Sequence, residues 1–107
     1  MDVEEAVQKV VQTIRDRYKP EKIILFGSRI WGEADEESDL DILIIKETDK
    51  REVERIREVS RLLRPRLLPV DILVKTPEEI QERLAVGDEF IREVLERGKV
   101  VYERVPV

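Results

Sequence analysis

Three aspartates in two apolar segments are the residues of this chain whose types and spacing could do chemistry. Asp39 and Asp41 open the apolar run at residues 40–45, and Asp71 stands near the start of another at residues 69–74. Side chains two positions apart in a strand point to the same side of a sheet. A neighbouring strand could add the third carboxylate, and such a trio repels itself unless it is solvated, paired with cationic side chains or neutralised by divalent cations.

This trio predicts a catalytic metal site with Asp39, Asp41 and Asp71 as ligands. Oxygen ligands favour hard cations, with magnesium as the default. In nucleotidyl transfer one magnesium ion activates the acceptor hydroxyl while a second holds the triphosphate. Asp39 and Asp41 would be shared between the ions, and Asp71 would face the acceptor and help to remove its proton. The structural alternative is that the carboxylates are exposed ends of strands.

A Gly-Ser turn follows the apolar run at residues 22–26 and could hold phosphate. Gly27 permits a tight turn and close approach of the backbone to a ligand. The Ser28 hydroxyl and adjacent amides could bind phosphate oxygens, Arg29 could donate to phosphate, and Ser38 could brace the loop. These residues form the predicted nucleotide-binding set, although a Gly-Ser pair alone is typical of an ordinary turn, and Arg29 of a protein surface.

Two other phosphate or nucleophile chemistries do not fit this turn. Gly27 and Gly32 have the spacing of a P-loop, but Glu33 and Ala34 stand where Lys and Ser or Thr are needed. Ser28 lacks a histidine base, because the chain has none. For Trp31 we expect an anchor for the loop in preference to a stacking partner for a base.

Composition narrows the function further. The 107 residues predict one domain over residues 1–107, and the absence of cysteine and histidine removes thiol catalysis, disulfides, Ser-His-Asp triads and almost every zinc site. A net charge of −5 argues against general nucleic-acid binding. The apolar runs are too short to span a membrane, and no signal peptide is recognisable, so we expect a cytoplasmic protein. The 42% of charged residues indicates a thermophilic source.

The periodicity and capping signals predict the elements that must position these residues. We expect a helix over residues 3–18 and a helix over residues 52–63 capped by Asp49 or Glu52. A third helix should begin at Pro77 with a capping box formed by Thr76 and Glu79, and Gly87 should divide it from another helix over residues 90–95. Strands are expected at residues 22–26, 39–46, 70–75 and 99–102. The predicted fold class is α/β, of the α+β type. It is a small mixed sheet of about four strands with helices packed on one face.

In these residues the chain resembles a minimal nucleotidyltransferase of the DNA polymerase beta superfamily. The resemblance covers nearly the whole chain and rests on Leu25-Phe26-Gly27-Ser28-Arg29, Ser38-Asp39-Leu40-Asp41 and Val70-Asp71-Ile72 in that order. It implies a polymerase-beta-like fold, triphosphate binding at Gly27 and Ser28, and two Mg²⁺ ions held by Asp39, Asp41 and Asp71. The acidic loop at residues 33–37 departs from relatives that carry a basic residue there, and this departure could weaken nucleotide binding.

The resemblance also implies a partner. Larger members of the superfamily add domains for the acceptor, so here the acceptor would come from another chain. In similar minimal proteins the partner is a HEPN-domain toxin, and the small protein is an antitoxin that transfers AMP from ATP to a toxin tyrosine. The alternative is a non-enzymatic antitoxin that blocks its partner sterically. The sequence leaves open the nucleotide, the acceptor, and a homodimer or hetero-oligomer formed through the apolar tail at residues 100–107.

Overall fold

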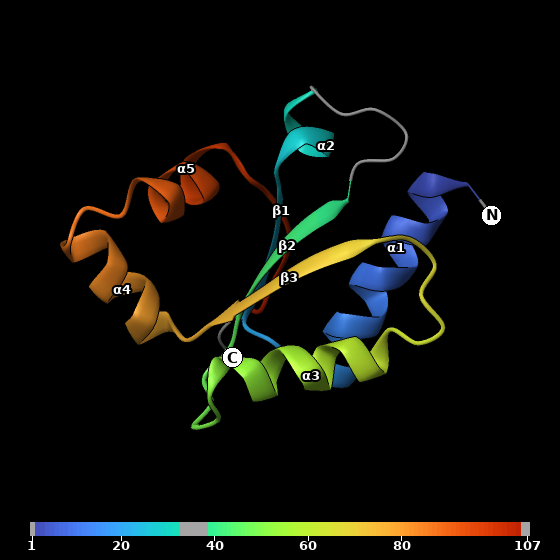
Figure 1. The fold of residues 1–107 in the computed structure, drawn as a ribbon, viewed down its shortest axis with the longest axis horizontal. Helices are drawn as coiled ribbons and strands as arrows, with labels where there is room; N and C mark the ends of the chain where they lie inside the picture. The colour runs from blue at the N-terminus through green and yellow to red at the C-terminus, as the bar shows by residue number, and fades with distance from the viewer. Residues whose placement is uncertain (1, 33–38, 106–107) are drawn as a thin grey trace.

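A four-stranded mixed sheet forms the centre of the computed structural model, which describes residues 2–32 and 39–105 (Figure 1). The elements are α1 (Val3–Thr13), η1 (Ile14–Tyr18), β1 (Lys22–Phe26), α2 (Ser28–Trp31), β2 (Leu40–Ile45), α3 (Glu52–Leu62), β3 (Val70–Lys75), α4 (Pro77–Ala85), α5 (Glu89–Arg97) and β4 (Lys99–Glu103). The strand order is β3-β2-β1-β4, with β2 and β3 parallel and the other pairs antiparallel. The predicted α+β class and mixed four-stranded sheet are confirmed.

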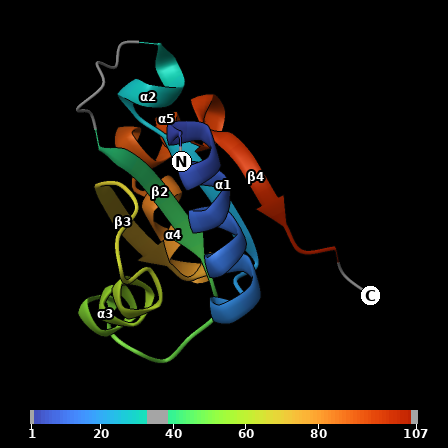
Figure 2. The same cartoon turned by 90° about the vertical axis from the view of Figure 1, so that its right-hand side faces the viewer.

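Helices cover both faces of the sheet, whereas the sequence predicts helices on one face. On one face Ile23 and Leu25 pack in a core with α1, η1 and α3. On the other face Ile24 and Phe26 pack with Ile91 and further residues of α4 and α5. Figure 2 shows α1 in front of the sheet and α4 and α5 behind it. The physical reason is visible in β1 and β2, whose continuous apolar runs are typical of strands buried on both faces.

The helix predicted over residues 3–18 forms, but its last five residues are a π-helix instead of α-helix. Asp2 caps its start by accepting a hydrogen bond from the Glu5 amide at 2.8 Å. Lys19 then adopts a left-handed conformation with φ of 56°, and Pro20 follows. The chain therefore leaves the helix abruptly and enters β1 at Lys22.

Arg55 joins α3 to the connection between β3 and α4. The predicted caps Asp49 and Glu52 are wrong, because α3 begins after Arg51, which makes no side-chain capping bond. Arg55, only 5% exposed, donates to the carbonyls of Lys50 and Val74 and to the Glu79 carboxylate.

The same Glu79 completes the predicted capping box with Thr76 at the start of α4. One buried guanidinium thus ties α3 to the end of β3 and to the first turn of α4. This network fixes the end of β3 opposite to Asp71.

The predicted last strand lies at the edge of the sheet as β4. Its pairing with β1 shifts register between Ile23 and Ile24, which oppose Tyr102 and Val100, so Val101 is the extra residue of a bulge. Val100 remains exposed. Among the helices of residues 2–32 and 39–105, none is long and apolar enough to span a bilayer.

Candidate active site

Asp41 and Asp71 stand side by side in the sheet. The parallel register of β2 and β3 pairs Asp41 with Asp71, and the antiparallel register of β1 and β2 pairs Phe26 with Asp41. Residues paired across neighbouring strands share a face, so Asp71, Asp41 and Phe26 form one row across three strands. This row lies on the face that α4 and α5 cover. Asp39 lies just before β2, two positions from Asp41, and is exposed.

The electrostatics of this row centre on Asp41. Its side chain is half-buried, whereas Asp71 is exposed. Burial first, then the charge of Asp71 and the charge of Asp39, raise the pKa of the Asp41 carboxyl above its ordinary value. All three aspartates therefore contribute to one region of negative potential, which a cation would relieve.

The Gly-Ser turn touches this carboxylate. Gly27 follows β1 with φ of 85° and ψ of −169°, a backbone conformation that L side chains rarely adopt. A Cβ atom built on Gly27 would lie 2.0 Å from Asp41 Oδ2, closer than real Cβ contacts. The absence of a side chain at Gly27 thus makes room for the Asp41 carboxylate, and the predicted phosphate turn and metal ligand are direct neighbours.

The short helix α2 begins at Ser28 and holds this turn in place. The amides of Ile30 and Trp31 both donate to the Gly27 carbonyl at 3.0 Å. The backbone amides of Ser28 and Arg29 stand in the first turn of this helix. The Trp31 indole donates to the Arg97 carbonyl at 3.1 Å, and the Arg97 guanidinium lies 4.4 Å from the ring centroid. Trp31 is therefore the expected anchor, tying α2 to the end of α5.

The predicted residue Ser38 and the acidic loop at residues 33–37 lie outside the described residues. Arg29 is half-buried beside Ser28 in α2. The structure thus brings Gly27, Ser28, Arg29, Asp41 and Asp71 to one end of the sheet, with Asp39 at its rim.

An apolar hollow next to the two carboxylates was missed by sequence reasoning. It has a volume of about 370 Å³, and its lining residues are Phe26, Asp41, Asp71, Ile72, Leu73 and Phe90. Phe90, from α5, meets Phe26 edge to face, with ring centroids 5.7 Å apart and planes at 78°. Phe90 belongs to the helix predicted over residues 90–95, and its side chain is 49% exposed. The only available signal was an aromatic residue in the first turn of that helix.

The donor set fits a hard divalent cation in its chemistry, although it is not gathered into a closed cage. Asp39, Asp41 and Asp71 offer carboxylate oxygens, the ligands that Mg²⁺ prefers. Across residues 2–32 and 39–105, no three acidic side chains lie close enough together to make a ready-made metal site. An incoming cation would first meet the pair formed by Asp41 and Asp71, and Asp39 is near enough to affect the Asp41 pKa.

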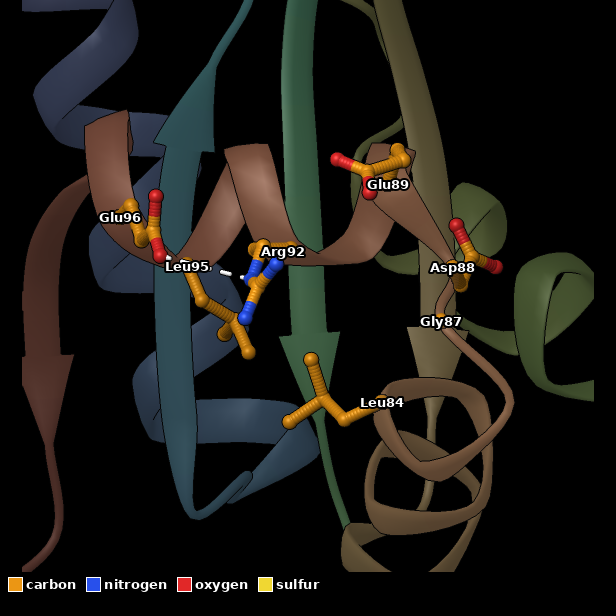
Figure 3. Close-up of a pocket in the computed structure, with 7 residues that line it drawn as sticks. All are labelled: Leu84, Gly87, Asp88, Glu89, Arg92, Leu95 and Glu96. Carbon is orange, nitrogen blue, oxygen red and sulfur yellow. Dashed lines mark ion pairs between the residues drawn. The ribbon is translucent and has the colours of Figure 1, made fainter.

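A second cavity, of about 380 Å³, lies between α4 and α5 and does not include the aspartate row (Figure 3). Leu84 and Leu95 point toward each other across it. Three of its charged side chains already have partners: Asp88 accepts from the Ile91 amide at 3.0 Å and pairs with Arg83, while Arg92 Nε lies 3.6 Å from Glu96 Oε1. These contacts account for the cavity as a gap between two packed helices.

Sequence comparisons agree with this geometry. The family model described as "Polymerase beta, Nucleotidyltransferase" matches residues 8–106. The chain is 35% identical over 104 residues to the "Putative protein adenylyltransferase MJ0604" of Methanocaldococcus jannaschii, covering 95% of this chain and all of that protein. A second protein of that organism, "Putative protein adenylyltransferase MJ1379", is 42% identical over 43 residues, which cover 40% of this chain and 43% of that protein.

Three solved structures share the fold. A "putative nucleotidyltransferase" from Sulfolobus solfataricus aligns with a TM-score of 0.66 and 23% identity, over 94% of this chain and 79% of that one. A toxin-antitoxin structure with AMP-PNP aligns with a TM-score of 0.62 and 21% identity, over 91% and 73% of the two chains. The toxin-antitoxin MntA-HepT aligns with a TM-score of 0.58 and 18% identity, over 94% and 73%. The matched family and full-length relative show that the chain belongs to the polymerase beta nucleotidyltransferase family and is a nucleotidyltransferase.

Proposed function

We propose that this protein transfers AMP from ATP to a hydroxyl of a partner protein, in a magnesium-dependent reaction. The observation that carries the proposal is the contact of the Gly27 turn with Asp41, which is itself the register partner of Asp71. This contact joins a phosphate-binding turn to two adjacent carboxylates, as nucleotidyl transfer requires. The protein-adenylyltransferase name of the 35%-identical relative supports the choice of AMP and of a protein acceptor.

In the proposed mechanism, the turn holds the leaving group and the aspartates hold the reacting centre. The Ser28 hydroxyl, the backbone amides at the start of α2 and the Arg29 guanidinium bind the terminal phosphates of ATP. Asp39, Asp41 and Asp71 would hold two Mg²⁺ ions, whose chemistry would be to lower the pKa of the acceptor hydroxyl and to stabilise charge on the leaving pyrophosphate. Asp71, at the acceptor side, takes the proton of the acceptor hydroxyl.

The bonds and charges balance in this scheme. The acceptor oxygen forms a bond to the α-phosphorus of ATP, and the bond from that phosphorus to the bridging oxygen of pyrophosphate breaks. The electron pair of the broken bond leaves with pyrophosphate beside Ser28. Gly27 contributes by letting the triphosphate approach Asp41 without a side chain in between.

We further propose that the acceptor is a tyrosine of a HEPN-type toxin, and that this protein is the antitoxin of the pair. Two solved structures with this fold are toxin-antitoxin assemblies, one of them with AMP-PNP. Modification of a toxin side chain would then be the neutralising event.

The decisive experiment is a transfer assay with ATP labelled at the α-phosphate. The protein is incubated with magnesium and a co-purified HEPN-domain partner, and label on the partner is followed by gel and mass spectrometry. Wild type should label the partner, and Asp71→Asn should lower the rate by 10²-fold or more, since proton transfer to a placed base contributes roughly that much. Absence of labelling by the wild type would overturn the proposed activity.

A second candidate function is that of a steric antitoxin with a degenerate site. It is favoured by one observation, the lack of a ready-made three-carboxylate cluster in the described part of the chain. A purely steric blocker would still neutralise its partner when it carries Asp41→Asn, and also when ATP is absent. An adenylyltransferase would lose neutralisation under either condition.

A further inference from the structure

We infer that the apolar hollow beside the aspartates is the nucleobase site, and that Phe90 is the residue on which the base stacks. This inference rests on the proposed function, because it assigns a place to one part of the ATP substrate. The hollow is lined by Phe26, Leu73 and Phe90 together with Asp41 and Asp71, so it opens directly beside the reacting centre.

The stereochemistry of the transfer decides which part of the substrates enters the hollow. In phosphoryl transfer the attacking and leaving oxygens lie roughly in line through phosphorus. Here the leaving group belongs at Ser28, at the end of β1, and the acceptor at Asp71 on β3. The line of reaction therefore crosses the sheet from β1 to β3 and passes Asp41 on the middle strand. The nucleoside is attached to the same phosphorus, so it must extend to one side of the line that joins the attacking and leaving oxygens.

Only one of the two sideways directions offers apolar contacts among the described residues. Toward the start of β2 the nucleoside would meet Asp39, an exposed carboxylate. In the opposite direction it meets the hollow, whose walls are two aromatic rings and aliphatic side chains. The volume of about 370 Å³ falls within the range of small-molecule sites. A planar base loses little free energy on leaving water, so it suits the apolar hollow.

Phe90 is suited to stacking by its orientation and exposure. Its ring meets Phe26 edge to face, at 78° between the planes, and the residue is 49% exposed. An edge-to-face contact fixes a ring without covering both of its faces. Phe26 is buried, so its ring is held in the core and supports the Phe90 ring that contacts it. The side chains that line the hollow include no hydrogen-bond donor, so affinity for the base would come from stacking and apolar contact.

The test compares two ligands that differ by the nucleoside. Binding of MgATP and of magnesium tripolyphosphate is measured by calorimetry for wild type, Phe90→Ala, Phe90→Tyr and Val86→Ala. Phe90→Ala should weaken MgATP binding by about ten-fold, the size of a lost base-aromatic stack, and leave tripolyphosphate binding unchanged. Phe90→Tyr keeps a ring and should bind MgATP like wild type. Val86, 71% exposed between α4 and α5 and outside the hollow, is the matched control.

The outcomes separate this inference from the proposed function. Equal effects of Phe90→Ala on both ligands, or an effect on neither, would overturn the base site while wild-type binding of MgATP still supports the nucleotidyltransferase. Reduced transfer to a protein acceptor with unchanged MgATP affinity would assign the hollow to the acceptor and also overturn the base site. If wild type binds neither ligand, the proposed function and the base site both fall.

Discussion

The charge of the Asp41 carboxylate serves the proposed function but is expected to lower the stability of the fold. It is half-buried, in register with Asp71 and in contact with the Gly27 turn. Its raised pKa means that the folded protein resists ionising this carboxyl because of burial and the neighbouring charges. A site that concentrates negative charge before its ligand arrives is expected to cost stability, and such costs are common at functional sites.

The first prediction concerns the pH dependence of this cost. Asp41 holds its proton more tightly in the folded than in the unfolded state. Its contribution to the free energy of unfolding therefore falls as the pH rises from the ordinary carboxyl pKa through the raised value. Asp41→Asn should raise the melting temperature at pH 7 without divalent cations. The corresponding gain in the free energy of unfolding should be below about 1 kcal/mol, because solvent screens the charge of a half-exposed group.

The pH profile of melting temperature checks this prediction. The difference in melting temperature between Asp41→Asn and wild type should shrink as the pH falls below about 4. At such a pH the Asp41 carboxyl is protonated, so residue 41 is uncharged in both proteins. Glu47→Gln removes an exposed carboxylate outside the site and should change little. A melting temperature of Asp41→Asn below that of wild type at pH 7 would contradict the electrostatic account of the site.

At the scale of elements, the site depends on how β1 passes into α2. Gly27 combines a positive φ with a close approach to Asp41, and the α2 amides then turn back onto the Gly27 carbonyl. Trp31 fastens the far end of this helical turn to α5 through Arg97. The proposed phosphate-binding turn is thus held between β1 and α5, which are far apart in sequence.

The second prediction separates backbone strain from close approach at this turn. Gly27 and Gly87 have nearly the same φ, 85° and 79°, but a Cβ at Gly87 would meet no atom within 4 Å. Gly87→Ala should cost about 1 kcal/mol of unfolding free energy from strain alone. Gly27→Ala should cost clearly more, because its Cβ would collide with the Asp41 carboxylate, and it should also abolish MgATP binding.

Urea denaturation of the two variants measures the difference in unfolding free energy, and calorimetry measures MgATP binding. Gly87→Ala should bind MgATP like wild type, since Gly87 lies away from the aspartates. Equal destabilisation of the two variants would show that the contact between Gly27 and Asp41 carries no energy.

At the scale of the whole molecule, stability and ligand binding are linked. A chain of 107 residues with net charge −5 has a modest core, so any ligand that binds only the folded state should shift its melting temperature visibly. Under the proposed function, the negative potential at Asp39, Asp41 and Asp71 should make that shift depend on cations, because triphosphate alone would be repelled. The proposal therefore predicts that metal binding and nucleotide binding are coupled.

The third prediction tests this coupling. At a MgATP concentration about a hundred times its Kd, the melting temperature should rise on the order of 10 °C, the shift that corresponds to such saturation in a domain of this size. ATP with EDTA should give a much smaller rise, and Asp71→Asn should reduce the rise seen with MgATP. Equal shifts with and without magnesium, measured by scanning fluorimetry, would speak against a cation between the carboxylates and the phosphates.

Local patterns in the sequence determined most of the elements of this protein. The strand predicted at residues 22–26 and the strand at residues 70–75 have the observed bounds, and the capping box of Thr76 and Glu79 forms as predicted. These features depend on residues close together in sequence, through runs of apolar side chains and short-range hydrogen bonds, so a single sequence contains the information. The predicted cap of α3 was wrong. The first turn of this helix is instead held by Arg55, whose partners Val74 and Glu79 are distant in sequence.

Only the tertiary structure decided how these elements combine. Asp41 and Asp71 are thirty residues apart in sequence, and their pairing depends on the direction and register of β3 beside β2. The placement of α4 and α5 on the second face of the sheet brings Phe90 to Phe26 and creates the hollow. Register and helix placement are set by the packing of side chains distant in sequence. The aspartates and the glycine could therefore be named from the chain, while the hollow beside them could not.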